Sequence, residues 1–147
     1  HDEPMSQGTR CRQLAEYIVF DSPLNMLCDS PSSYEREHEC TSFIAGIPTV
    51  WDHTTVLCGK VSEYIATARQ KGNIWYVGAM TNWEECTIEI DLSFLGAGDF
   101  KAEIFRDGVN AYRYARDYKK ELIEIPADRK LKVRMAPGGG FAARIYQ

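Results

Sequence analysis

The spacing of apolar residues along the chain changes near residue 60. From Lys60 onward, apolar and polar residues alternate with a period of two, which is typical of strands that place one face on a core. This pattern predicts seven short strands, at residues 61–68, 74–80, 87–92, 100–105, 121–125, 131–135 and 141–145. Turn signals that contain glycine, among them Asp107-Gly108, separate the strands, and Lys71-Gly72-Asn73 predicts a hairpin. We therefore expect an antiparallel β-sandwich over residues 60–147.

Upstream of residue 60 the spacing of apolar residues is helical. A first helix is predicted to begin after Thr9 as its N-cap and to end before Asp21-Ser22-Pro23, because the residue before proline avoids the helical conformation. Its apolar face, at spacings of three and four, consists of Cys11, Leu14, Ala15, Ile18 and Val19.

A second helix is predicted at residues 34–45, with Glu35 and Glu37 in its first turn and with Gly46 and Pro48 ending it. The short apolar run at residues 24–28 is compatible with either a strand or a helical turn. These elements hold few apolar residues, so residues 1–59 are interpreted as the tail of an α/β layer.

The predicted fold class is therefore α+β, with a short helical segment, residues 1–59, followed by an antiparallel sandwich of about seven strands. The apolar face of the first helix needs a cover. It could fold back on the sandwich or pair with a second copy of the chain. Because the other elements of the α/β layer are missing, we expect the isolated chain to dimerise or aggregate.

Composition narrows the possible partners of the chain. The 147 residues have a net charge of −4, and the basic residues are scattered, so no basic face for nucleic acid is expected. No apolar run reaches the about 18 residues of a membrane span. Residues 1–10 are polar, and no signal peptide is visible. The five cysteines form no CxxC motif, which favours free thiols over a zinc site.

Eight short motifs, taken together in their order and spacing, resemble the C-terminal end of a glycoside hydrolase family 97 enzyme. They are SQGTRC at 6–11, QLAEY at 13–17, SPL at 22–24, DSP at 29–31, IPTVWD at 47–52, WYVG at 75–78, DLSFL at 91–95 and APGGG at 136–140. The resemblance covers nearly the whole chain.

The resemblance implies a parent with an N-terminal β-sandwich, a catalytic (β/α)8 barrel and a C-terminal antiparallel β domain. It implies hydrolysis of α-glucosides or α-galactosides, dependence on calcium held by glutamates, and a periplasmic or secreted location. Residues 1–59 then resemble a remnant of the barrel, and residues 60–147 the C-terminal domain. The barrel needs eight strands to close, and at most two would lie here.

The catalytic and calcium-binding carboxylates of that family lie upstream of the segment that aligns here. The resemblance therefore assigns no catalytic and no metal-binding residue to this chain, and we expect the isolated chain to be inactive. Its expected partners are the remainder of the barrel or a second copy, with an oligosaccharide bound by the parent enzyme. Neither nucleic acid nor a membrane is expected.

Acidic residues could still suggest chemistry of the chain's own. Glycoside hydrolysis needs two carboxylates about 5–10 Å apart, and Asp21, Asp29 and Asp52 are candidates by type. Aspartates beside Ser or Pro more commonly cap helices or turns. A metal site around His38 among three glutamates is a weaker interpretation than a solvated helix face. A triad built on His53 lacks the residue order and the local signatures of known triads.

The aromatic residues could stack on sugar rings, but in strands they are more often core residues. Trp83, in the predicted turn at residues 81–85, is the candidate for carbohydrate contact. An aromatic and basic loop at residues 112–116 is interpreted as loop packing or an interface. The glycine run at residues 138–140 lacks the residues of a phosphate loop and is expected to supply positive φ before the last strand.

Two functions follow from these patterns. The first is a structural or oligomerisation scaffold, the C-terminal fragment of an α-glycosidase that acts on terminal α-linked glucose or galactose. The second is a stand-alone carbohydrate-binding or interaction module. An exposed row of aromatic side chains on one sheet face, with measurable sugar affinity, would favour the second.

Overall fold

The structure is a computed structural model and describes residues 8–19, 38–48, 50–60, 63–82, 84–111, 113 and 117–147. Helices α1 (Arg10–Val19) and α3 (His38–Gly46) come first in the chain. The strands are β1 (His53–Lys60), β2 (Tyr64–Lys71), β3 (Ile74–Thr81), β4 (Cys86–Asp91), β5 (Lys101–Asp107), β6 (Tyr118–Glu124), β7 (Lys130–Met135) and β8 (Gly140–Tyr146), with a short 3-10 turn η1 (Ser93–Leu95) after β4.

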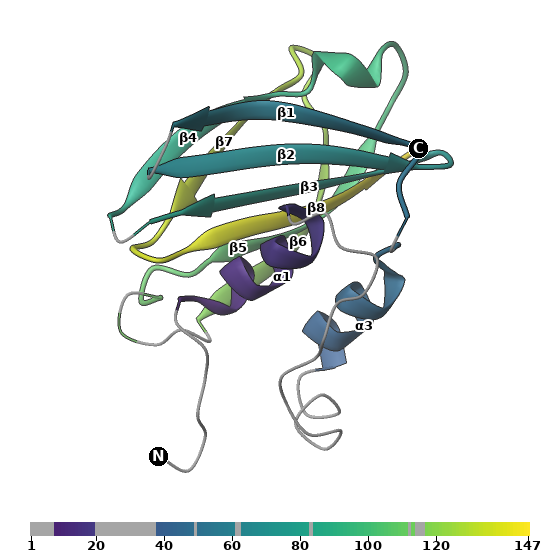
Figure 1. Cartoon of the computed structure of the whole chain (residues 1–147). Coiled ribbons are helices and arrows are strands. Elements are labelled where there is room, and N and C mark those ends of the chain that lie inside the picture. The colour runs from purple at the N-terminus through teal and green to yellow at the C-terminus, as the bar shows by residue number, and fades with distance from the viewer. Residues whose placement is uncertain are drawn as a thin grey trace.

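Six strands form one antiparallel sheet in the order β1-β2-β3-β8-β5-β6, and β4 pairs with β7 in a second, smaller sheet. The small sheet packs on one face of the large sheet. Both helices lie on the opposite face (Figure 1). This arrangement confirms the predicted α+β fold class with an antiparallel sandwich.

All seven predicted strands are present, and β2 and β3 form the predicted hairpin, pairing from Tyr64 with Thr81 to Lys71 with Ile74. The prediction missed β1, which pairs with β2 along its length. Its sequence HTTVLCGK does not alternate, because β1 is an end strand whose first four residues, His53 to Val56, are all exposed.

The central strands are buried on both faces. In β3, Val77 and Ala79 pack in the core between the two sheets, whereas Tyr76 and Met80 pack under α1. Strands covered on both faces read as continuous apolar runs. The uninterrupted segment IWYVGAM therefore reflects the position of β3 between the small sheet and the helix.

Helix α1 buries the predicted face, Cys11, Leu14, Ala15, Ile18 and Val19. Leu14 and Ile18 are fully buried and cluster with residues of three strands, among them Tyr76, Phe105 and Ala142. The helix therefore folds back on the sandwich, which is one of the two covers considered above. Since its apolar face is covered within the chain, that face gives no reason to expect dimerisation or aggregation.

The second predicted helix is present as α3, whose described part begins at His38 and ends at Gly46. Phe43 of α3 packs edge-on against Phe105 of β5, with ring centroids 4.9 Å apart. Glu35, Glu37 and the apolar run at residues 24–28 lie outside the described residues.

The free-thiol interpretation is confirmed for Cys11 and Cys86. No helix in the described part of the chain is long and apolar enough to cross a membrane.

Gly78 sets the distance between α1 and the sheet. A Cβ at this position would lie 2.9 Å from Cβ of Ile18 and 3.0 Å from the carbonyl oxygen of Ala15. We expect Gly78→Ala to lower the free energy of unfolding by about 1–3 kcal/mol, because overpacking forces the helix outward. Urea unfolding followed by tryptophan fluorescence measures this.

The matched control is Gly46→Ala at the end of α3, where an added Cβ would meet no atom within 4 Å. It should change the free energy of unfolding by less than about 0.5 kcal/mol. Equal unfolding midpoints for Gly78→Ala and the wild type would contradict the close approach.

Candidate functional site: the helix–sheet junction

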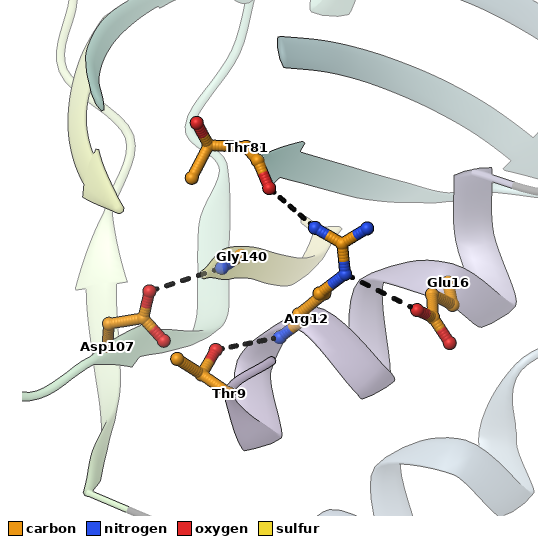
Figure 2. Close-up of polar contacts among 6 residues, drawn as sticks. All are labelled: Thr9, Arg12, Glu16, Thr81, Asp107 and Gly140. Atoms are coloured by element: carbon orange, nitrogen blue, oxygen red, sulfur yellow. Dashed lines mark hydrogen bonds and ion pairs between the residues drawn. The ribbon is translucent and has the colours of Figure 1, made fainter. Parts of the chain in front are cut away.

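Asp107, the last residue of β5, lies beside the N-terminus of α1 with a side chain only 7% exposed. Its Oδ2 accepts hydrogen bonds from the backbone N–H groups of Ala136, at 3.0 Å, and Gly140, at 3.1 Å. Figure 2 shows the bond from Gly140. A helix N-terminus carries a partial positive charge and favours a nearby anion. Asp107 therefore joins three segments: the end of β5, the loop before β8 and the start of α1.

The glycine loop before β8 makes this arrangement possible. Gly138 has a φ of 64°, which confirms the expected positive φ, and its carbonyl oxygen accepts the backbone N–H of Thr9 at 3.1 Å. Gly139 and Gly140 are required for another reason. A Cβ at Gly139 would collide with the Asp107 carboxylate, and one at Gly140 would collide with the backbone of Arg12.

Thr9 is the N-cap of α1, as predicted. Its Oγ1 accepts the backbone N–H of Arg12 at 3.2 Å. The Arg12 guanidinium donates to the carbonyl oxygen of Thr81 at 2.5 Å and lies 3.6 Å from the carboxylate of Glu16 (Figure 2). Arg12 thus ties the first turn of the helix to the end of β3.

Arg69 of β2 holds the other end of α1. It is 5% exposed, and its Nε and one terminal nitrogen donate to the carbonyl oxygens of Ile18, at 2.6 Å, and Val19, at 2.9 Å. The last carbonyl groups of a helix lack partners within the helix and carry a partial negative charge. A buried cation therefore satisfies the C-terminus of α1, as Asp107 complements its N-terminus.

Burial and the local hydrogen bonds shift the pKa of Asp107 in opposite directions. Removal from water raises the pKa of Asp107 above its ordinary value, although contacts with Thr9, Ala136 and Gly140 act to lower it. The pKa of the neighbouring Cys11 thiol is also raised, chiefly by burial and then by the charge of Asp107. Cys11 is therefore a protonated packing residue and not a nucleophile.

Of the three candidate aspartates, Asp52 lies in the described part of the chain. Its carboxylate accepts the backbone N–H of Gly72 at 2.8 Å and lies 3.7 Å from the ammonium group of Lys71. The hydrogen bond from Gly72 is the main cause of its lowered pKa. Asp52 thus stabilises the β2–β3 turn. Asp21 and Asp29 lie outside the described residues.

Trp83, the candidate for carbohydrate contact, and most of the aromatic loop at residues 112–116 also lie outside the described residues. The other two tryptophans pack within the protein. Trp75 packs against Phe94 with ring centroids 4.5 Å apart and ring planes tilted by 53°, and Trp51 packs edge-on against Tyr76 with centroids 5.3 Å apart.

Of the candidate metal site around His38, Glu35 and Glu37 lie outside the described residues. Glu39 accepts the hydroxyl of Tyr118 at 2.9 Å, and His38 lies 3.5 Å from the hydroxyl of Ser42. His53 is exposed at the start of β1. Residues 8–19 and the other described ranges hold no group of three or more His, Cys, Asp or Glu side chains placed to bind a metal.

The buried polar residues of the helix–sheet junction have a structural role. Asp107 is the one acidic residue among the buried side chains that the structure describes. Glycoside hydrolysis needs two carboxylates that face one bond. Sequence reasoning missed both Asp107, which was interpreted as part of a turn, and Arg69, because no motif marks a charge that a distant helix will bury.

Comparison with known proteins agrees with this architecture. Residues 50–146, most of the chain, match the family model described as glycosyl-hydrolase 97 C-terminal, oligomerisation. The chain belongs to this family. The resemblance to glycoside hydrolase family 97 is thereby confirmed, and the β domain that the family model covers begins just before β1.

Individual relatives match the chain over nearly its whole length. A retaining alpha-galactosidase from Bacteroides thetaiotaomicron is 63% identical over 145 residues, which is 99% of this chain and 22% of the relative. A glycoside hydrolase family 97 enzyme from Pseudoalteromonas sp. strain K8, solved with panose, superposes with a TM-score of 0.91 at 37% identity. It covers 95% of this chain and 23% of that one.

A beta-arabinopyranosidase structure shares the fold, with a TM-score of 0.82 at 20% identity over 95% of this chain and 22% of its own. The chain thus spans less than a quarter of the length of each of these three relatives.

The raised pKa of Asp107 predicts a pH-dependent stability. A raised pKa in the folded state means that folding favours the protonated carboxyl group. The protonated carboxyl group therefore contributes to the free energy of unfolding. This contribution is complete below the ordinary pKa of about 3.9 and is lost as pH rises through the raised pKa. We expect the wild type to lose free energy of unfolding relative to Asp107→Asn as pH rises through this window.

Asp91→Asn is the matched control. The Asp91 carboxylate is exposed and accepts the backbone N–H of Ser93 at 2.9 Å, and this bond lowers its pKa. The wild type should therefore gain stability relative to Asp91→Asn as pH rises. Urea titrations at several pH values measure both slopes, and parallel curves for Asp107→Asn and the wild type would contradict the assignment.

Replacement of Arg69 tests the other end of the helix. We expect Arg69→Met to lower the free energy of unfolding by about 2–4 kcal/mol, because the buried carbonyl groups of Ile18 and Val19 lose charged donors. Lys132→Met, at an exposed position of β7, should stay within about 0.5 kcal/mol of the wild type. Chemical unfolding measures both variants. Similar losses of the free energy of unfolding in the two would argue against a specific role of Arg69 at the C-terminus of α1.

Proposed function

We propose that this chain is the C-terminal scaffold and assembly domain of a retaining α-galactosidase whose catalytic residues lie in another part of the enzyme. The observation that carries the proposal is the 63% identity, over 99% of this chain, to a protein named as a retaining alpha-galactosidase. The described residues support a scaffold role, since the buried charges of Arg69 and Asp107 both bond to α1 and hold it to the sheet.

Helix α1 is the element that would link the two parts of such an enzyme. One face packs on the sheet, and the opposite face carries Gln13, Glu16 and Tyr17, which are half-buried. We infer that this second side meets the remainder of the barrel. On this proposal, residues 1–59 derive from the barrel and residues 60–147 from the C-terminal domain. The two parts do not fold separately, because α1 and β1 pack with residues 60–147.

The family resemblance allows terminal α-linked glucose or galactose as the substrate of the parent enzyme. Galactose is favoured because the relative named as a galactosidase is 63% identical, against 37% for the enzyme solved with panose. Calcium dependence and a periplasmic or secreted location enter the proposal through the family resemblance alone.

A stand-alone carbohydrate-binding module is the second candidate. It would need an exposed aromatic platform, and Trp83 is the residue retained for that role. Trp51 and Trp75 are engaged with Tyr76 and Phe94 inside the fold, which favours the scaffold. Calorimetric titration with galactose and with maltose distinguishes the two, because only the module predicts heat of binding that Trp83→Ala abolishes.

The scaffold proposal predicts that the purified chain self-associates and does not turn over sugar substrates. We expect no release of nitrophenol from 4-nitrophenyl α-galactoside or α-glucoside, with or without added calcium, because hydrolysis needs a facing carboxylate pair. Sedimentation velocity should show concentration-dependent association. Turnover by the pure chain, or a monomer at every concentration, would contradict the proposal.

A further inference from the structure

The large sheet ends in two strands, β1 and β6, and these two edges differ in chemistry. An end strand presents a row of backbone N–H and C=O groups with no partner in the sheet, which can pair with another chain. Proteins commonly block such an edge with charged side chains. The two ends of this sheet can therefore be compared directly.

Strand β6 carries the protection expected of a free edge. Four of its seven residues are charged, in the sequence YKKELIE. These charges are held by ion pairs across the sheet surface: Glu121 lies 2.5 Å from Arg106 and 3.0 Å from Lys119, and Lys120 lies 3.6 Å from Glu103. A strand docking on β6 would have to displace or match this charge pattern.

Strand β1 lacks this protection. Between Thr54 and Gly59 its sequence TTVLCG contains no charged residue. Val56 is 66% exposed, and Val50, just before the strand, is 62% exposed. The described residues include four large apolar side chains with this degree of exposure, and two of them thus lie at the β1 edge.

A β-bulge between Val56 and Cys58 limits the part of β1 that can pair in a regular way. Bulges bend a strand and interrupt its ladder. Regular pairing with β2 runs from His53 to Val56 and resumes at Cys58, and all four residues of the longer first part are exposed. A contact at this edge is therefore short and centred near Thr55.

We propose that β1 is the strand through which two copies of this chain join, antiparallel and edge to edge, so that the two large sheets become continuous. This rests on the proposed function, because the family model that covers residues 50–146 is described by oligomerisation. A second copy is the occupant that the chemistry favours, since a two-fold contact brings together two identical uncharged edges.

Centring the two-fold axis on Thr55 gives a compatible register. Thr55 then lies opposite the partner's Thr55, and Thr54 lies opposite the partner's Val56. Pairs of β-branched residues at facing positions stabilise an antiparallel ladder. The same operation applied to β6 about Glu121 would place two carboxylates directly opposite each other, which is destabilising.

The test compares two matched variants, Val56→Lys and Leu122→Lys. Both residues are highly exposed, Val56 at 66% on β1 and Leu122 at 71% on β6, so lysine fits either site without entering the core. We expect Val56→Lys to raise the dissociation constant of the dimer about tenfold or more, and Leu122→Lys to leave it within about twofold. Sedimentation velocity over a concentration series measures both.

Thr55→Asp is the second variant, because it places like charges opposite each other at the two-fold axis, and it should also weaken the dimer. Circular dichroism spectra and thermal unfolding show whether each variant keeps the fold. A wild-type dimer that Leu122→Lys weakens and Val56→Lys and Thr55→Asp leave intact overturns the β1 interface, while the scaffold function stands. A wild-type chain that stays monomeric overturns the scaffold function itself.

Discussion

The burial of α1 between charges of opposite sign is the interaction on which the rest of this structure depends. The helix crosses the large sheet with Asp107 of β5 at its positive end and Arg69 of β2 at its negative end. Both charges are buried and bond to backbone groups: Arg69 donates to two carbonyl oxygens, and Oδ2 of Asp107 accepts from two N–H groups. Because β2 and β5 lie on either side of β3 and β8, the helix locks four strands into one register.

The bonds of Asp107 and Arg69 to the two ends of α1 decide whether this helix belongs with a barrel or with the β domain. A helix that ends a barrel layer would be free to move with the barrel if it met the sheet through apolar contacts alone. Here its two ends are bonded to the sheet, and Gly78, Gly139 and Gly140 remove the side chains that would hold it away. Motion of α1 relative to the sheet would leave buried donors and acceptors without partners, which is costly. The helix therefore behaves as part of the β domain.

Sequence reasoning succeeded where burial follows a period. The apolar face of α1, from Cys11 to Val19, and the seven alternating strands could be predicted because each side chain shows its own environment. It failed where environment depends on distant residues. Arg69 reads as an ordinary solvent-facing residue of β2, and Asp107 as the start of a turn. The sequence of β1 has no period of two, because residues on both faces of this end strand are exposed.

The same helix clamp also reaches the edge strand. Besides its bonds to α1, the guanidinium of Arg69 donates to Oγ1 of Thr54 on β1 at 3.2 Å. The side chain that caps the helix therefore also holds the start of the uncharged edge in place against β2. An edge with few core contacts of its own would fray if it depended on backbone pairing alone. Because the buried Arg69 bonds to both α1 and β1, the docking of α1 helps to fix the position of β1. The proposed partner surface on β1 is therefore held in place as long as the helix stays docked.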